Sequence, residues 1–113
     1  MDSLARPEAR FLVAFAGDEA LGCGALRLLE PGVGEIKRMY VRPEARGRGV
    51  GAQLLAALEA EARALAVSVL RLETGIRQPE AIQLYERRGY HRRAAFGEYR
   101  EDPLCRCYEK LLA

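Results

Sequence analysis

The stretch VRPEARGRGVGAQLL, residues 41–55, ends one kind of local structure and begins another. Its dipeptide Arg42-Pro43 ends a strand, because a residue before proline resists the helical conformation and proline cannot donate to a sheet ladder. Glycines then occupy three alternate positions, and a run of helix-forming residues follows at once, which a flexible solvated linker would not explain. Successive backbone N–H groups in such a turn can converge beside the positively charged N-terminus of a helix. The stretch therefore predicts an anion site.

The segments around this turn predict an alternation of strands and helices. Upstream, short apolar runs separated by Gly and Pro turns are typical of an antiparallel meander. Downstream, apolar residues recur with the 3.6-residue period of a helix, an apolar run follows, and a second amphipathic segment lies between Pro79 and Gly89. The expected strands are residues 10–17, 19–29, 34–41, 67–73, 90–95 and 104–112, and the expected helices are residues 49–65 and 79–88. This β-β-β-α-β-α-β-β order predicts an α/β (α+β) domain with a mixed sheet and helices on its faces.

Length and composition limit the class of protein. A chain of 113 residues predicts one domain, residues 1–113, with a single modest core. Half of the residues are hydrophobic and 30% are charged, which is typical of a globular domain. No apolar run reaches the roughly 20 residues of a membrane helix, and the N-terminus lacks the apolar core of a secretory signal. A net charge of +2 does not by itself indicate nucleic-acid binding, so we expect neither a membrane nor a nucleic-acid partner.

The cysteines indicate a reducing compartment rather than a metal site. The chain has three cysteines, and an odd number without a secretory signal predicts reduced thiols in the cytoplasm. Cys105 and Cys107 would lie on one face of a strand, but a metal site would need two further ligands. The single histidine, His91, belongs to no metal motif. We therefore expect no metal, and we interpret the cysteines as small buried hydrophobic residues.

Two other phosphate-binding motifs are alternatives for the glycine turn. A P-loop ends in Gly-Lys-Ser/Thr, which the sequence GAQ at residues 51–53 does not match. Residues 47–52 do match the dinucleotide fingerprint G-x-G-x-x-A, and Glu73 ends the next strand, as a ribose-binding acid would. That fingerprint should follow its strand directly, whereas residues 42–46 intervene here, and the preceding strand is amphipathic. A dinucleotide-binding domain stays as a less favoured alternative.

Two motifs together resemble one family, the GNAT superfamily of N-acetyltransferases. The pattern V-x-P-x-x-R-G-x-G-x-G, residues 41–51, is similar to the family's acetyl-CoA site. QPEAIQLYERRGY, residues 78–90, resembles the family segment N-x-x-A-x-x-L-Y-x-x-x-G-F/Y, with Gln78 where asparagine is usual. The resemblance runs from about residue 11 to the end of the chain. It implies a mixed, mostly antiparallel sheet flanked by helices, lacking the usual first strand and helices before Arg10. Either a partner subunit, in a homodimer, completes the acceptor wall or the chain is a minimal member.

The resemblance also implies a reaction and a cosubstrate. An N-acetyltransferase of this kind passes an acetyl group from acetyl-CoA directly to a primary amine of a small molecule or to a protein amino terminus. The pantetheine arm would enter between two parallel strands that splay apart, and the loop FGEYREDP would face the acceptor, with Glu98 and Tyr99 as candidate contacts. The residues implied for cofactor binding are Met39, Tyr40, Val41, Arg46, Gly47, Arg48, Gly49, Val50, Gly51, Gln78 and Tyr85. A CoA-binding module without catalysis is the alternative.

Three side chains are candidates for the chemistry. Tyr85 matches the tyrosine that the family uses as general acid for the departing thiolate, although a helical tyrosine can also simply belong to the core. Glu35 lies where the family often places a carboxylate that acts through water. Its other interpretation is an exposed strand residue paired with Lys37 or Arg38. Glu73 is the second candidate for the base.

Overall fold

Three antiparallel strands form the first half of the sheet in the computed structural model, which describes residues 9–97 and 103–112. These three strands are β1 (Ala9–Ala16), β2 (Glu19–Glu30) and β3 (Val33–Val41). The second half of the sheet consists of β4 (Val69–Gly75), β5 (His91–Arg93) and β6 (Cys105–Leu111). β3 pairs with β4 in parallel, whereas β6 pairs antiparallel with both β4 and β5, which gives the order β1-β2-β3-β4-β6-β5. The predicted mixed, mostly antiparallel sheet is therefore confirmed. The two candidate acceptor contacts Glu98 and Tyr99 lie outside the described residues.

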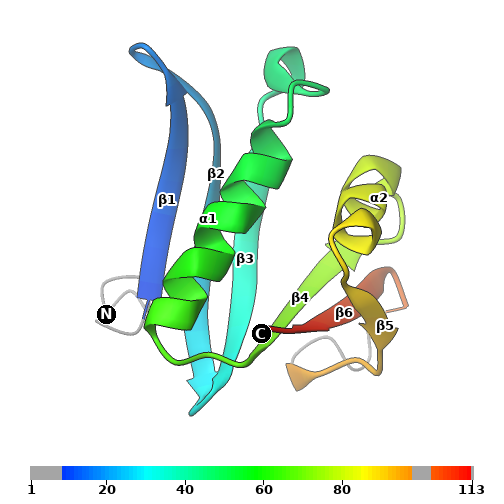
Figure 1. Ribbon diagram of the computed structural model, residues 1–113. Coiled ribbons are helices and arrows are strands. Elements are labelled where there is room, and N and C mark those ends of the chain that lie inside the picture. The colour runs from blue at the N-terminus through cyan, green and yellow to red at the C-terminus, as the bar shows by residue number, and fades with distance from the viewer. Residues whose placement is uncertain (1–8, 98–102, 113) are drawn as a thin grey trace.

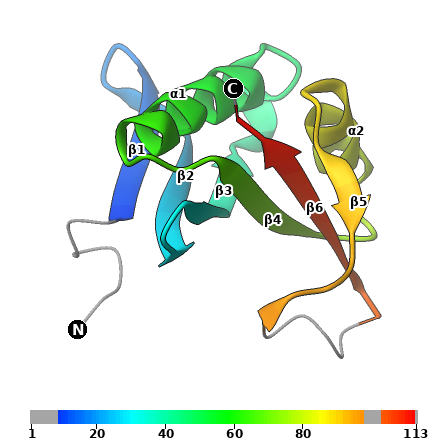
Figure 2. The same cartoon turned by 60° about the horizontal axis from the view of Figure 1, so that its bottom comes forward.

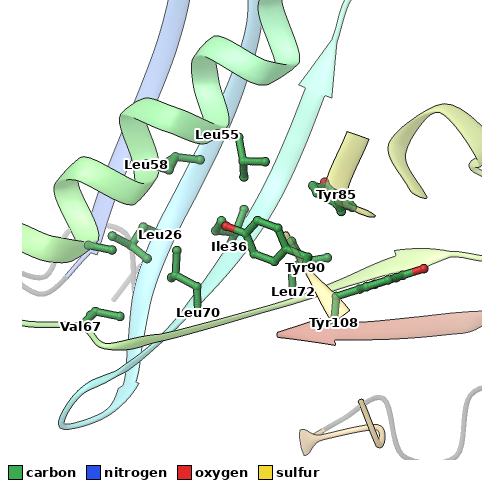
Figure 3. Close-up of a cluster of buried hydrophobic side chains, with 11 residues drawn as sticks. Leu26, Ile36, Leu55, Leu58, Val67, Leu70, Leu72, Tyr85, Tyr90 and Tyr108 are labelled. Atoms are coloured by element: carbon green, nitrogen blue, oxygen red, sulfur yellow. The ribbon is translucent and has the colours of Figure 1, made fainter. Parts of the chain in front are cut away.

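Both α-helices pack on the same face of this sheet. The 3-10 helix η2 (Pro43–Ala45) follows β3 and leads into α1 (Val50–Ala64), and α2 (Pro79–Arg87) follows β4. Figures 1 and 2 show α1 over the β1–β3 part of the sheet and α2 beside the β4–β6 part. Leu55 and Leu58 of α1 share one buried cluster with Tyr85 of α2 and with Leu26 and Ile36 of the sheet (Figure 3). This shared core fixes the two helices relative to each other and to the strands beneath them.

The opposite face of the sheet carries exposed apolar side chains on β1. Side chains alternate along a strand, and Leu12 and Ala14 pack with the side chains of α1. Phe11, Val13 and Phe15 point the other way and are 49%, 39% and 62% exposed. Because both described α-helices pack on the other face, this row of side chains is available to another surface.

β3 and β4 pair over a short length and then diverge. Their register ends at Ile36↔Leu72, although β3 continues to Val41 and β4 continues to Gly75. Each strand keeps its outer partner beyond that point, β3 with β2 and β4 with β6. The two strands therefore separate toward their C-terminal ends, as Figure 1 shows.

The alternation of side chains that is usual along a strand breaks at one position within residues 34–41. Arg38 has a φ of 57°, in the left-handed region, and the register between β2 and β3 shifts by one residue at this point. Such a bulge reverses the side-chain pattern beyond it and bends the strand. As a result Met39, rather than Arg38, packs against the same cluster as Ile36. The bulge lies just beyond the residues at which β3 parts from β4.

The structure also shows the state of the cysteines, the length of the helices and the distribution of potential metal ligands. None of the three cysteines, all within the described residues, is disulfide-bonded, and burial raises the pKa of the Cys107 thiol. Cys107 is buried as predicted, whereas Cys23 and Cys105 are half-buried. Neither α1 nor α2, the α-helices of the described part, is long and apolar enough to cross a membrane. Residues 9–97 and 103–112 bring together no group of three or more potential metal ligands.

A buried polar cluster joins α1 to β6 and to the segment after α2. Glu59 of α1 is 8% exposed, and its Oε2 accepts hydrogen bonds from the Tyr90 hydroxyl at 2.8 Å and from Lys110 Nζ at 3.0 Å. Burial and the hydrogen bond to Glu59 raise the pKa of Tyr90, so its hydroxyl stays a donor. The periodicity of the helix gave no sign of this cluster, since Glu59 occupies an apolar face beside Leu58. A buried carboxylate is tolerated there because two donors satisfy it.

We predict that Lys110→Met lowers the free energy of unfolding by about 2 kcal/mol, because it leaves a buried carboxylate without its cation. Urea unfolding measures this change. In a Glu59→Gln background the same substitution should cost less than half as much, because the uncompensated charge is absent. An equal loss in both backgrounds would show that Lys110 stabilises the fold through its stem rather than through Glu59.

Candidate active site

A pocket of about 950 Å³ lies beside the end of β3, past the point at which β3 separates from β4. Its walls are the end of β3, the glycine turn with the first turn of α1, and one side of α2. The residues of the predicted cofactor set that line it are Met39, Tyr40, Val41, Arg46, Gly47, Gly49, Val50, Gly51, Gln78 and Tyr85. Arg48 and Glu35 are not among its lining residues. Two motifs separated in the sequence thus meet at one pocket.

The glycine turn adopts a conformation that other residues rarely accept. Gly47 and Gly49 have φ values of 77° and 81°, both in the left-handed region. Gly49 is the N-cap of α1, which has no side-chain cap, and the N–H of Gln53 donates to the Gly49 carbonyl at 3.0 Å. The amides that come before Gln53 in the helix have no acceptor within it. They lie at the pocket wall, where the helix N-terminus also carries partial positive charge.

The end of β3 presents backbone groups to the same pocket. The N–H of Arg42 donates to the Leu21 carbonyl at 2.8 Å, and the register pairs Cys23 with Tyr40. Because hydrogen-bonding direction alternates along a strand, the backbone groups of Tyr40 face β2. Those of its neighbours Met39 and Val41 face away from β2, toward the side on which β4 has separated.

Two side-chain contacts steady this strand end. The Nε of Arg46 donates to the Val41 carbonyl at 3.0 Å. The guanidinium of Arg46 also lies 5.8 Å from the centroid of the Tyr40 ring, a cation–π distance. Arg46 therefore fixes the turn against β3, and the N–H of Val41 is the group of that residue that stays directed toward the pocket.

Tyr85 is a buried tyrosine at the pocket wall. It is 5% exposed, and the centroid of its ring lies 6.0 Å from that of Tyr90, in an edge-on arrangement, and 6.5 Å from that of Tyr108, in a tilted one. Burial and, to a smaller extent, the negative charge of Glu73 raise the pKa of Tyr85 to about 12. Tyr85 is thus at once a core residue and a pocket residue, so the two interpretations of its sequence position are compatible. At neutral pH its hydroxyl is protonated and can donate a hydrogen bond.

The two candidate carboxylates have different surroundings. Glu35 is 1% exposed, and its Oε1 accepts from Arg27 Nε at 3.1 Å, so its interpretation as an exposed strand residue is wrong. It lies in the part of β3 that is still paired with β4, opposite Arg71. Glu73 is the first residue of β4 beyond that pairing, and its charge acts on Tyr85. Of the two carboxylates, only Glu73 contributes to the raised pKa of Tyr85, although neither is among the lining residues of the pocket.

Other lining residues carry no signal that singles them out in the sequence. Arg87 and Arg88, at the C-terminal end of α2, line the pocket. Basic residues in the last turn of a helix are common and are normally explained by the helix dipole. Only the position of α2 beside the first turn of α1 gives these two side chains a place at the pocket.

Comparisons with known proteins agree with this geometry. The sequence model described as "Acetyltransferase (GNAT) family" matches residues 2–90. The IAA acetyltransferase of Azospirillum brasilense is 47% identical over 113 residues, which cover 99% of this chain and 74% of that protein. A Klebsiella pneumoniae protein assigned as an acyl-CoA N-acyltransferase has a TM-score of 0.88 at 50% identity, covering 94% of this chain and 74% of that one. The PaiA N-acetyltransferase of Thermoplasma acidophilum, solved in complex with coenzyme A, has the same fold, with a TM-score of 0.81 at 22% identity, over 93% of this chain and 62% of that one.

These comparisons and the sheet topology decide between the families considered. A dinucleotide-binding domain needs a mainly parallel sheet, whereas the sheet formed by the described residues has one parallel pair, β3 with β4. The family model that matches residues 2–90 and the two relatives at about half identity all indicate acyl transfer. The chain belongs to the Acetyltransferase (GNAT) family and is an acyltransferase.

Proposed function

We propose that the protein transfers an acetyl group from acetyl-CoA directly to a primary amine, either of a small molecule or at a protein amino terminus. The observation that carries this proposal is the pocket beside the separated strands, which gathers the glycine turn, the end of β3 and Tyr85. Membership of the family and the coenzyme A complex of the Thermoplasma protein with the same fold support acetyl-CoA as the cosubstrate.

The backbone of the pocket suits the two polar parts of the cosubstrate. Amides of residues 47–51, at a helix N-terminus, would bind the diphosphate, and Arg46 and Arg48 would add positive charge around it. The N–H groups of Met39 and Val41 would pair with the pantetheine amides, as an added strand does at a sheet edge. Gln78, at the N-cap of α2, would contact the same arm. Tyr40 would contribute its ring rather than its backbone, because its backbone groups face β2.

The reaction needs a polarised carbonyl and a proton near the departing thiolate. Of the N–H groups of Met39 and Val41, the one beside the thioester would donate to the thioester oxygen as negative charge develops there, which leaves the other to pair with the pantetheine arm. Tyr85, with a pKa of about 12, would lose its proton to a thiolate of pKa near 8.5 only at a cost of about 5 kcal/mol. We therefore assign Tyr85 a hydrogen bond to the sulfur that tightens as the C–S bond breaks, with proton transfer late in that step.

The amine must also reach its neutral form. At pH 7 about 10% of an α-amine but only about 0.04% of a lysine amine is neutral, so a lysine acceptor depends more on a base. Glu73 suits this role better than Glu35, because Glu35 is buried and bonded to Arg27. We propose that Glu73 accepts the amine proton, directly or through water.

The extent of the domain, its compartment and its oligomeric state are proposed as well. We propose that residues 1–113 act as one acetyltransferase domain, with reduced cysteines in the cytoplasm and without a bound metal. The exposed row Phe11, Val13 and Phe15 supports a homodimer in which a second copy covers that face of the sheet.

Replacing Tyr85 by Phe should lower kcat for acetyl transfer about 100-fold and leave the Kd for acetyl-CoA within about twofold, because the hydroxyl acts on the leaving sulfur. Thiol release with a panel of primary amines measures the first quantity, and calorimetry measures the second. Tyr108→Phe is the matched control, since it removes a buried hydroxyl bonded to Glu86, away from the pocket lining. A kcat that is unchanged across pH in Tyr85→Phe would refute the assigned role, and a wild-type protein inactive with every amine would refute the proposed acceptor class.

Glu73→Gln should lower kcat/KM for an alkylamine about tenfold or more at pH 7, and the loss should shrink as pH rises toward the pKa of the amine. Glu35→Gln should mainly lower the free energy of unfolding, because Arg27 loses its carboxylate partner. The pH dependence of kcat/KM and urea unfolding of both variants separate the two roles. If the pH-dependent loss followed Glu35→Gln instead, Glu35 would be the base.

A further inference from the structure

The pocket walls carry an excess of positive charge that the proposed diphosphate contacts do not use. Among the lining residues that the structure describes, the arginines come from positions 46, 77, 87 and 88, and the one acid is Glu80. Arg46 is engaged with the Val41 carbonyl and the Tyr40 ring. The arginines of α2 have no such engagement within the described residues, where no ion pair involves Arg87 or Arg88.

The chemistry of coenzyme A leaves one group still to be bound. The diphosphate is a diester, and a ring of main-chain N–H groups suits it. Coenzyme A also carries a phosphate monoester on the 3′ oxygen of its ribose, with a charge of about −1.5 to −2 at pH 7. A doubly charged monoester is best matched by guanidinium groups, which can bind two of its oxygens at once.

The packing of the two helices places Arg87 and Arg88 beside the glycine turn that would bind the diphosphate. A Cβ added to Gly51, in the first turn of α1, would lie 3.1 Å from Leu84 Cδ2 of α2. Arg87 and Arg88 are three and four residues beyond Leu84, so they lie one helical turn farther along the same side of α2. The last turn of α2 therefore flanks the first turn of α1, where the amides of the glycine turn converge. Arg77 lies before the other end of this helix of nine residues, next to Gln78 and the pantetheine path.

We infer that Arg87 and Arg88 form a subsite for the 3′-phosphate of coenzyme A, which makes the enzyme select acetyl-CoA over its 3′-dephospho form. This inference rests on the proposed function, because it takes coenzyme A as the occupant of the pocket. The competing explanation is that both arginines only stabilise the C-terminus of α2 through the helix dipole. That explanation predicts a loss of stability without the ligand and no dependence on the 3′-phosphate.

The test measures binding of CoA and 3′-dephospho-CoA by calorimetry at one ionic strength. The double variant Arg87→Gln/Arg88→Gln keeps most of the side-chain length and removes the charge. We expect wild-type protein to bind CoA roughly tenfold more tightly than dephospho-CoA, because each exposed charge pair contributes only modestly to binding. We expect the double variant to bind both ligands within about twofold of each other. Arg92→Gln, an exposed arginine of β5 outside the pocket lining, and Arg77→Gln are the matched controls and should keep the wild-type preference.

Each other outcome has a distinct meaning. Wild-type protein that binds both ligands equally would overturn the subsite and leave the proposed function standing. So would a double variant that loses equal affinity for both ligands, or an Arg77→Gln variant that alone abolishes the preference. Wild-type protein that binds neither ligand would overturn the proposed function, and the subsite with it. Unfolding curves of the free variants show whether the charges also stabilise α2.

Discussion

The site depends on the separation of two parallel strands. β3 and β4 stay paired only as far as Ile36 and Leu72, and each then follows its own outer partner. Unpaired backbone groups in the middle of a sheet are costly unless something satisfies them. The separation therefore leaves a row of donors and acceptors along the end of β3 for which a ligand with amide groups is a natural partner. The bulge at Arg38 bends β3 at this position.

The core holds this arrangement in place from one side. Buried leucines of α1 and Tyr85 of α2 share one cluster with the sheet, so the helix that begins at the glycine turn and the helix that carries the tyrosine cannot shift independently. The hydrogen bonds of Glu59 with Tyr90 and Lys110 also connect α1 to the segment after α2 and to β6. Positioning of this kind matters for acyl transfer, since the contribution of each catalytic group falls steeply with misplacement.

Much of the fold could be predicted from the sequence, because local signals determined it. The order of the strands and helices could be predicted from Pro43, from the alternating glycines and from the 3.6-residue period. The motifs of residues 41–51 and 78–90 predicted which segments line the pocket. Buried polar groups could not be predicted in the same way. Glu59 lies on the apolar face of α1, and its partner Lys110 is distant in the sequence. Glu35 lies opposite Arg27 and Arg71, and only the register of β2, β3 and β4 brings it to these arginines and shows why its burial is tolerated. Likewise Arg87 and Arg88 resemble any basic helix end until α2 is packed beside α1.

Amide hydrogen exchange of the protein with and without acetyl-CoA tests the central claim most directly, since it reports on the backbone donors themselves. The account predicts that acetyl-CoA slows exchange at Met39 and Val41 and across residues 47–51, while the amide of Tyr40, already directed to β2, changes little. Protection confined to another surface, or no change in these amides at saturating acetyl-CoA, would contradict the account.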